Sequence, residues 1–502
     1  MSRAFQKNRA ALARLLGNDA LAERLLNTRI GVWSDVSSDV AAGRLIAEAL
    51  GDTLARLWQR LDVTGPLEEV FGNAARQAAA SAGYQSEIEQ RWQPPYDVVV
   101  AIGTDPPDSA GMVVRVGASG WVVSAGTGAH VDDDPNPVGP TLAAGCAGSE
   151  VFKIIFADAL SGRAGERLGD LTWSAWSYGA DLLNPRPMTL DVSRVQVLGA
   201  GAVTHGFAWA LTRWPAKLIG QMDLIDPDAF DQSNAQRYAG LAESEIGQPK
   251  AEALAARLRN RIKDIDFVPH PTDMNTYFAS LDKKTIALAI AGLDSPEARR
   301  QLALKLPKRT INMWTEGFYL GAARFGFGDQ IPCLFCAYPE PVGAVKDEVG
   351  EIYQEIQSTL IMPWRIRELL DTSASLTAAE LHGIAGVFGL DANALAGKPL
   401  RSIRGILCAT GKVQIGNGAA DTDVPLAHAS LMAGVFGFVE FIHELSGVAG
   451  AQTRWAYSTL HPPRHGFLEL TTRRTDCYLC GDEMTRRVAE RVHGRVDALA
   501  VA

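Results

Sequence analysis

The sequence lacks any block of like charge and any long apolar run free of polar residues. Its 48 Lys and Arg and 57 Asp and Glu residues leave a net charge of −9 over 502 residues. With no basic cluster and no acidic tail, nucleic acid is a poor candidate partner. The most apolar stretch, Val424 to Ile442, contains His428 and Glu440, which predicts a buried helix rather than a membrane span. Residues 1–16 lack the apolar core of a secretory signal, so we expect a cytoplasmic protein.

The chain has few cysteines, and four of the six form two CxxC pairs. Cys333 and Cys336 form the first CxxC motif, and Cys477 and Cys480 form the second. Four thiolates give Zn²⁺ its tetrahedral shell. The two motifs therefore predict a zinc site that joins the two ends of the long segment 337–476. Two redox pairs or four unrelated free thiols are the alternatives, but neither pair opens a helix after a strand as a thioredoxin-like motif does.

Three other residues of reactive type are interpreted as packing residues. Cys146 stands in a helical run of small residues, where a free cysteine is usually buried. His428 and His443 are interpreted as packing or capping, because the four paired cysteines already complete a zinc shell.

Strand and helix signals alternate along the first part of the chain. Strands are predicted at 28–34, 97–103 and 120–126, and a helix over 40–51, which favours an α/β sheet. Residues 54–61 fit either a strand or a continuation of that helix. The turn after the first strand, WSDVSSD, has no glycine, so a pyrophosphate cannot approach its backbone. This part therefore has the strand and helix order of a nucleotide-binding fold but lacks the glycine loop that binds phosphate.

The segment 194–250 has the build of a nucleotide site. It begins with RVQVLGAGAVTHG, an apolar run typical of a buried parallel strand, followed by a glycine turn. Gly199 and Gly201 allow a phosphate to approach a helix N-terminus. The glycine pattern is imperfect, because Thr204 stands where GxGxxG requires its third glycine.

Acidic and basic residues follow the second strand of this segment. Asp226 ends that strand, where a carboxylate can accept from ribose hydroxyls. Asp228, Asn234, Arg237 and Lys250 come next. An arginine and a lysine converging on one site favour a triphosphate, whereas a NAD oxidoreductase needs only the glycines and one acid. The alternative is that both cations are solvated surface charges.

The order GAGA, IDPDAFDQSNAQR and QPKAEALAARL resembles the adenylation domain of ubiquitin-activating enzymes and the related adenylyltransferases of the ThiF-MoeB type. That family carries a D-x-D…S-N…R run with a lysine shortly after. The resemblance implies that Asp226 binds the ribose and that Asn234, Arg237 and Lys250 contact the phosphates. It also implies Asp294 as the Mg²⁺ ligand, with helix N-cap as the alternative role. The implied cofactors are ATP, Mg²⁺ and Zn²⁺.

The resemblance also implies a domain plan. The fold is expected to be α/β, with two Rossmann-like adenylation-type domains, an inserted and mostly helical catalytic-cysteine region, and a four-cysteine zinc site. The expected parts are an inactive adenylation-like domain (1–192), the first part of the active domain (193–336), the catalytic-cysteine region (337–422), and the return of the active domain with the second zinc pair and the tail (423–502). The family also implies an arginine donated by the N-terminal helices, for which Arg3 and Arg9 are the candidates.

One cysteine lies between the zinc pairs. Cys408 is flanked by Arg401, Arg404 and Lys412, and cationic neighbours lower the pKa of a thiol. In the activating enzymes, a cysteine in this interval takes the acyl group from the adenylate as a thioester, which makes Cys408 the implied nucleophile. The alternative is a buried cysteine at the end of a strand.

The implied function is ATP-dependent activation of a ubiquitin-like protein. Adenylation of its C-terminal carboxylate is expected first, then a thioester on Cys408 and transfer to a conjugating enzyme. Activators of this size in bacterial ubiquitin-like defence operons imply an antiviral conjugation system. The alternatives are a sulfur-carrier adenylyltransferase without a stable thioester and a non-catalytic scaffold for a ubiquitin-like protein. A monomer with paired internal halves and a homodimer both fit the sequence.

Overall fold

The computed structural model describes residues 2–84, 86–107, 111–281, 285–327, 331–339, 349, 352–353, 356, 361–372, 374–388, 390–400, 402–404, 426–448, 453–470 and 473–493. The chain divides into two compact units. Unit 1 comprises Met1–Pro339 and Val424–Ala502, and unit 2 comprises Glu340–Asp423.

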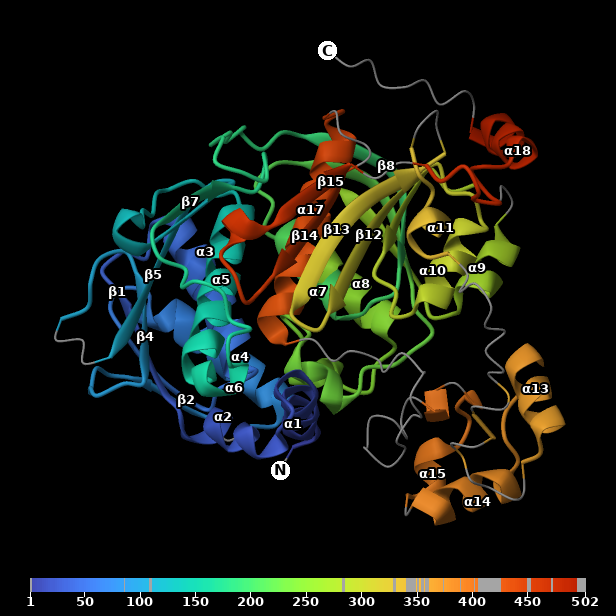
Figure 1. Cartoon of the computed structure of the whole chain (residues 1–502), viewed down its shortest axis with the longest axis horizontal. Helices are drawn as coiled ribbons and strands as arrows, with labels where there is room; N and C mark the ends of the chain where they lie inside the picture. The colour runs from blue at the N-terminus through green and yellow to red at the C-terminus, as the bar shows by residue number, and fades with distance from the viewer. Residues whose placement is uncertain are drawn as a thin grey trace. The chain divides into compact units, whose positions relative to one another are not determined.

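The first half of unit 1 is built on an α/β sheet (Figure 1). Its described strands are β1 (Arg29–Ser34), β2 (Arg60–Thr64), β3 (Glu87–Gln90), β4 (Val98–Ile102), β5 (Met112–Ser119), β6 (Val122–Ala125) and β7 (Leu171–Ser174). Its helices are α1 (Arg3–Leu16), α2 (Glu23–Asn27), α3 (Ala41–Ala55), α4 (Glu68–Ala82), α5 (Val138–Ile155) and α6 (Ala157–Leu160). The sheet order is β3-β2-β1-β4-β5-β6-β7, parallel through β5 and antiparallel beyond it.

The second half of unit 1 carries a second sheet. Its described strands are β8 (Leu190–Leu198), β9 (Leu218–Ile225), β10 (Ile265–His270), β11 (Leu288–Ala291), β12 (Arg309–Glu316), β13 (Tyr319–Gly326), β14 (Thr453–Ser458) and β15 (Phe467–Leu470). Its helices are α7 (Ala202–Leu211), α8 (Lys250–Arg261), α9 (Met274–Ser280), α10 (Pro296–Ala303), α11 (Leu334–Ala337), α17 (Ala427–Leu445) and α18 (Glu483–His493). The order is β10-β9-β8-β11-β12-β13-β14-β15, with the last three strands antiparallel to their neighbours.

The two sheets repeat one topology. Strands β1 to β5 occupy the same relative positions as β8 to β12. In both halves a long helix connects the next two antiparallel strands: α5 connects β6 to β7, and α17 precedes β14. Unit 2 is inserted between β13 and α17. The predicted α/β architecture with two Rossmann-like sheets is therefore confirmed.

The strands predicted in the first half are confirmed as β1, β4 and β6. Residues 54–61 hold the end of a helix and the start of a strand. Helix α3 continues to Ala55, beyond the predicted end at residue 51, and β2 begins only at Arg60.

Helices from both halves form the centre of unit 1 (Figure 1). Helix α5 packs on the first sheet and α17 on the second, and the two helices also pack on each other. Glycines permit α17 to approach two neighbouring helices closely. A Cβ on Gly145 of α5 would overlap Met432 of α17, and a Cβ on Gly434 of α17 would overlap the backbone of α7. Cys146 of α5 is 2% exposed, and burial raises the pKa of its thiol to about 12, in keeping with the predicted packing role.

Two buried histidines of α17 should make the stability of unit 1 depend on pH. Burial lowers the pKa of His428 and of His443 from 6.5 to about 3. Between these values the unfolded chain binds protons that the native chain does not, so the free energy of unfolding falls as the pH falls. The slope is at most about 1.4 kcal/mol per pH unit for each histidine.

We expect His428→Asn to make the free energy of unfolding depend less steeply on pH, because one of the two buried imidazoles is removed. Urea unfolding at about pH 6.5, 5.5 and 4.5 measures this slope. Replacing the exposed His130 by Asn is the control, because that residue is not buried by folding. An unchanged slope in His428→Asn would show that burial of this imidazole does not hold it neutral.

In unit 2 the described residues are mainly helical, as predicted. The helices are α13 (Pro363–Thr372), α14 (Ala378–Phe388) and α15 (Ala392–Leu395). They have an apolar core of their own, and Arg365 of α13 forms an ion pair with Glu380 of α14, with Nε and Oε1 2.8 Å apart. Cys408 lies outside the described residues.

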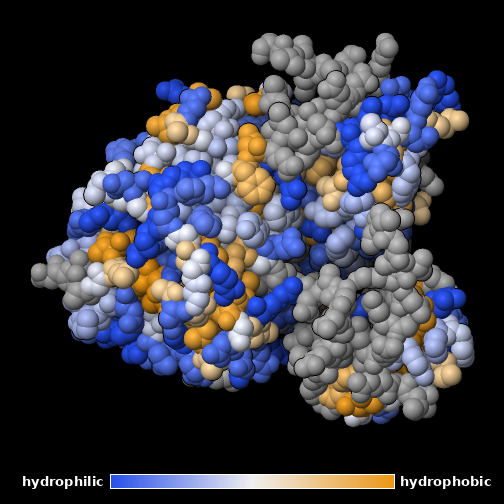
Figure 2. All heavy atoms as spheres, viewed as in Figure 1, coloured by the Kyte–Doolittle hydropathy of each residue, from blue (hydrophilic) through white to orange (hydrophobic). Residues whose placement is uncertain are grey.

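The molecular surface is mixed in character. On the face shown in Figure 2, apolar side chains are interspersed among hydrophilic ones. Among the described residues, no helix has the length and apolar character needed to cross a membrane. The apolar helix α17 is buried instead, as predicted for this stretch.

Candidate active site

The glycine turn lies where three strands of the second sheet end. The N–H of Gly199 donates to Ile225 O at the end of β9 (2.9 Å), and the N–H of Gly292, after β11, donates to Leu198 O (2.9 Å). Gly199 has φ +84°, and a Cβ there would lie 2.7 Å from Gly292 O. Both features require glycine at this position. Gly201 is the N-cap of α7, so the turn opens a helix as predicted.

Thr204 has a structural role in the turn that the glycine pattern did not reveal. The residue is 1% exposed, and its hydroxyl donates to Gly199 O over 2.6 Å. A glycine at this position would leave that carbonyl without this bond. Threonine in place of the third glycine of GxGxxG therefore stabilises the turn through this hydrogen bond.

Asp226 connects the glycine turn to the end of β9. One carboxylate oxygen accepts from the N–H of Ala200 (2.6 Å), and the other accepts from the N–H of Asp228 (2.8 Å). Burial raises the pKa of Asp226, and the nearby Lys250 opposes this shift. Each oxygen retains a second acceptor position, so the carboxylate can also accept from the hydroxyls of a bound ribose.

Lys250 is the first residue of α8 and is 8% exposed. Its Nζ lies 2.9 Å from Oδ2 of Asp228, and its backbone N–H donates to Asp228 O over 2.8 Å. Burial disfavours the ammonium, but Tyr238, Asp226 and Asp228 outweigh it and raise the pKa of Lys250 above the ordinary value. The site therefore holds a fixed positive charge at a helix N-terminus, and the surface-charge alternative for Lys250 is wrong.

Arg237 is half-buried and follows the short 3₁₀ helix η3 (Gln232–Gln236). Its Nη1 is buried and has no hydrogen-bond partner among the described residues. Its guanidinium carbon lies 5.4 Å from the centroid of the Tyr238 ring. Because a buried donor without a partner is costly, an anionic group accepting from Nη1 would stabilise this arrangement.

The segment before Arg237 is tied to the N-terminal helix. Asn234 Oδ1 accepts from the N–H of Asp231 (2.9 Å), which closes η3. Asp231 forms an ion pair with Arg3 of α1, with Oδ2 and Nη1 2.8 Å apart. Of the two candidate arginines, Arg3 thus reaches the site segment, whereas Arg9 forms an ion pair with Asp19.

Asp294 lies in the loop between β11 and α10, two residues after Gly292, and is exposed. The N-cap of α10 is Ser295, whose Oγ accepts from the N–H of Ala298 (3.2 Å). The alternative role of Asp294 as the helix cap is therefore wrong, and its carboxylate can serve a ligand.

The two CxxC pairs come together in space. The sulfur atoms of Cys333, Cys336, Cys477 and Cys480 all lie within 4.8 Å of one another. The Cys333 and Cys477 sulfurs are 3.7 Å apart, and those of Cys336 and Cys480 are 3.3 Å apart. A tetrahedron with Zn–S bonds of about 2.3 Å has edges of about 3.8 Å, so this donor set fits a zinc ion.

A family comparison agrees with this geometry. The family model of the ThiF family matches residues 185–479, which begin just before β8 and end between the last two cysteines. The chain belongs to the ThiF family.

Named relatives of this ThiF-family chain include activating enzymes. Uncharacterized protein y4jF of Sinorhizobium fredii is 28% identical over 437 residues, covering 83% of this chain and 81% of that protein. The NEDD8-activating enzyme E1 catalytic subunit of Saccharomyces cerevisiae is 30% identical over 118 residues, covering 24% of this chain and 38% of that protein. These matches confirm the resemblance to ubiquitin-activating and ThiF-type enzymes. The structure of Escherichia coli MccB with AMPCPP and MccA matches with a TM-score of 0.33 and 15% identity, covering 58% of this chain and 67% of that chain, which supports no further inference.

The sequence patterns did not predict two residues that lie beside the site, Asp231 and Tyr238. Asp231 accepts from the N–H of Ser233 and is the N-cap of η3, and the run DQSN carries the usual signal for such a cap. Tyr238 is 4% exposed, its ring lies beside the Arg237 guanidinium, and it raises the pKa of Lys250. Its sequence context carried no signal for that position.

Proposed function

We propose that this protein catalyses ATP-dependent adenylation of the C-terminal carboxylate of a ubiquitin-like protein. The observation that carries the proposal is the pair of cations beside the glycine turn. Nη1 of Arg237 has no hydrogen-bond partner among the described residues, and Tyr238, Asp226 and Asp228 raise the pKa of Lys250. A triphosphate supplies the acceptors that these cations need. Membership of the ThiF family and the match to a NEDD8-activating subunit support the same reaction.

In the proposed reaction, a carboxylate oxygen of the carrier protein attacks the α-phosphorus of ATP. The bond from that phosphorus to the oxygen of the β-phosphate breaks, pyrophosphate leaves with the electron pair, and an acyl adenylate is formed. Arg237 and Lys250 offset the charge that develops on pyrophosphate. Asp226 orients the nucleotide through the ribose, and Asn234 fixes η3 so that Arg237 is held in place.

Asp294 is the proposed ligand for a magnesium ion. Its carboxylate is exposed at the same edge of the sheet, and Mg²⁺ prefers carboxylate and phosphate oxygens. When bound, the ion would neutralise part of the phosphate charge. Asp228, already paired with Lys250, would hold that lysine toward the phosphates.

The second proposed step forms a thioester on Cys408. Its thiolate attacks the acyl carbon, a carbon–sulfur bond forms, the bond to the phosphate oxygen breaks, and AMP leaves. The position of Cys408 between the zinc pairs and beside Arg404 supports this assignment. Transfer to a conjugating enzyme follows in the proposed pathway. We place that pathway in a bacterial antiviral conjugation system, and the Sinorhizobium relative supports a bacterial setting.

A non-reducing gel separates the two steps. The protein is incubated with ATP, Mg²⁺ and a panel of ubiquitin-like proteins, and pyrophosphate release is measured in parallel. We expect a thiol-sensitive adduct with Cys146→Ala but not with Cys408→Ala, while both variants release pyrophosphate. Pyrophosphate release without any adduct in the wild type would replace the second step by sulfur-carrier adenylation. No release with any carrier would leave a scaffold role.

The first half should not bind ATP, so we expect one nucleotide per chain by isothermal titration calorimetry. Asp35 follows β1 where Gly199 follows β8 in the second half. Its carboxylate accepts from the N–H of Thr104 (3.1 Å) and from its hydroxyl, and these bonds outweigh burial and lower the pKa of Asp35. The resulting negative charge would repel a phosphate. A stoichiometry of two would contradict this account.

A further inference from the structure

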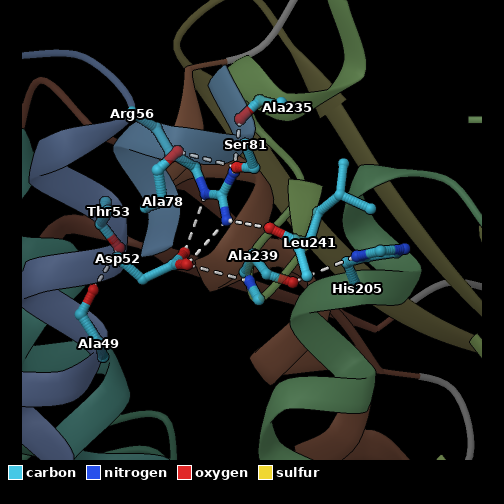
Figure 3. A network of polar contacts seen from close by, with 12 residues as sticks. Ala49, Asp52, Thr53, Arg56, Ala78, Ser81, His205, Ala235, Ala239 and Leu241 are labelled. Carbon is cyan, nitrogen blue, oxygen red and sulfur yellow. Dashed lines mark hydrogen bonds and ion pairs between the residues drawn. The ribbon is translucent and has the colours of Figure 1, made fainter. Parts of the chain in front are cut away.

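A buried ion pair of the first half contacts the segment that carries Arg237. Asp52 lies near the end of α3 and Arg56 is the residue after it, and they are 4% and 0% exposed. Two bonds join them, Nε to Oδ2 (3.0 Å) and Nη2 to Oδ1 (2.8 Å). Figure 3 shows this pair facing the residues of the second half.

The pair holds residues 235–241 at both ends. Arg56 Nη1 donates to Ala235 O (2.6 Å), and its Nη2 donates to Leu241 O (3.3 Å). Asp52 Oδ1 accepts from the N–H of Gly240 (3.1 Å). These three backbone groups precede and follow Arg237 and Tyr238 in the sequence, so the first half fixes the segment on both sides of the proposed phosphate-binding arginine.

Arg56 uses its whole guanidinium in this arrangement. A guanidinium has five N–H donors, and five bonds are made: two to Asp52, one to Ser81 Oγ (3.1 Å), and one to each of the two carbonyls. A lysine has three donors without a planar fork and cannot reproduce this set. The geometry therefore specifies arginine.

Stability alone does not explain a buried ion pair at this interface. Taking two charges out of water is costly, and an apolar pair of similar volume would join the halves equally well. What the ion pair adds is direction, because its hydrogen bonds fix named backbone atoms of one segment. We infer that Asp52 and Arg56 are positioning residues through which the first half holds Arg237 in the geometry that binds the phosphates of ATP. This inference rests on the proposed function.

The test is the Kd for ATP with Mg²⁺, measured on the full chain by isothermal titration calorimetry, with near-ultraviolet circular dichroism as the check on folding. We expect Arg56→Lys to raise the Kd about tenfold, the effect of one lost hydrogen bond to a charged group. Asp52→Asn, a milder variant, removes the charge that orients Arg56 and should raise the Kd severalfold.

Glu48→Gln is the matched control. Glu48 lies on the same face of α3, one turn before Asp52, and forms an ion pair with Arg213 of the second half, whose Nε lies 2.9 Å from Oε2. It belongs to the same interface, but its two carboxylate oxygens accept from Arg213 rather than from the segment 235–241. A Kd equal to that of the wild type in Glu48→Gln distinguishes positioning of the segment from general loosening of the interface.

A double-mutant cycle decides whether Arg56 acts through Arg237. In an Arg237→Ala background, the account predicts that Arg56→Lys causes little further loss of ATP affinity. A full and additive loss in that background, or a wild-type Kd in Arg56→Lys, would overturn the inference while leaving the proposed function intact. A wild-type chain that binds no ATP would overturn the proposed function itself.

Discussion

Replacing Arg237 by alanine is expected to reduce ATP–pyrophosphate exchange about 100- to 1000-fold, the usual loss when one fixed donor to transition-state charge is removed. Lys250→Ala should cause a loss of similar size. Neither cation is replaceable by water, because Nη1 of Arg237 is buried and Lys250 is 8% exposed. The exchange assay uses full-length protein, ATP, Mg²⁺, labelled pyrophosphate and a carrier protein that supports exchange in the wild type.

Lys217→Ala is the control for loss of a positive charge. Lys217 is exposed, forms an ion pair with Asp264 and precedes β9, so it lies at the opposite end of that strand from Asp226. Its exchange rate should equal that of the wild type. Wild-type exchange in both Arg237→Ala and Lys250→Ala would show that these cations do not contact the phosphates.

Cys480→Ser is expected to abolish metal binding and to lower the free energy of unfolding by more than about 4 kcal/mol. The four sulfur atoms lie among apolar side chains of the second core cluster, including Leu334, Phe335 and Leu479. With one thiolate missing, the tetrahedral shell is incomplete and the metal no longer joins the two distant CxxC pairs. Elemental analysis and urea unfolding measure the two effects.

Cys146→Ala is the control, because Cys146 is a buried residue of α5 and is not one of the four clustered cysteines. It should keep one zinc per chain. Purified wild-type protein without zinc, or full zinc content in Cys480→Ser, would contradict the zinc assignment.

The residues of the site that could be predicted from the sequence share one property. Gly199, Asp226 and Asp294 each follow a strand, and Lys250 begins a helix. The carboxyl ends of parallel strands meet at one edge of a sheet, so local patterns were enough to bring these residues together. The cysteine pairs were predictable for a different reason, because zinc ligation demands four such donors.

The contribution of the first half could not be predicted in the same way. Arg3 and Arg56 contact the segment around Arg237 from 228 and 179 residues upstream of their partners, and only the packing of whole helices brings them there. A weak signal did exist: Arg44, Glu48, Asp52 and Arg56 recur every four residues along α3 and at its C-cap. That spacing places charges on one helix face, but it does not name the surface that the face contacts.

The most direct test of the central claim follows the oxygen of the carrier protein. A ubiquitin-like protein labelled with ¹⁸O in its C-terminal carboxylate is incubated with the enzyme, ATP and Mg²⁺, and the released AMP is analysed by mass spectrometry. Attack of the carboxylate on the α-phosphorus, followed by attack of a thiol on the acyl carbon, transfers one ¹⁸O to AMP. The account predicts singly labelled AMP. Label that appears in inorganic phosphate, or that stays entirely in the protein while ATP is consumed, would contradict it.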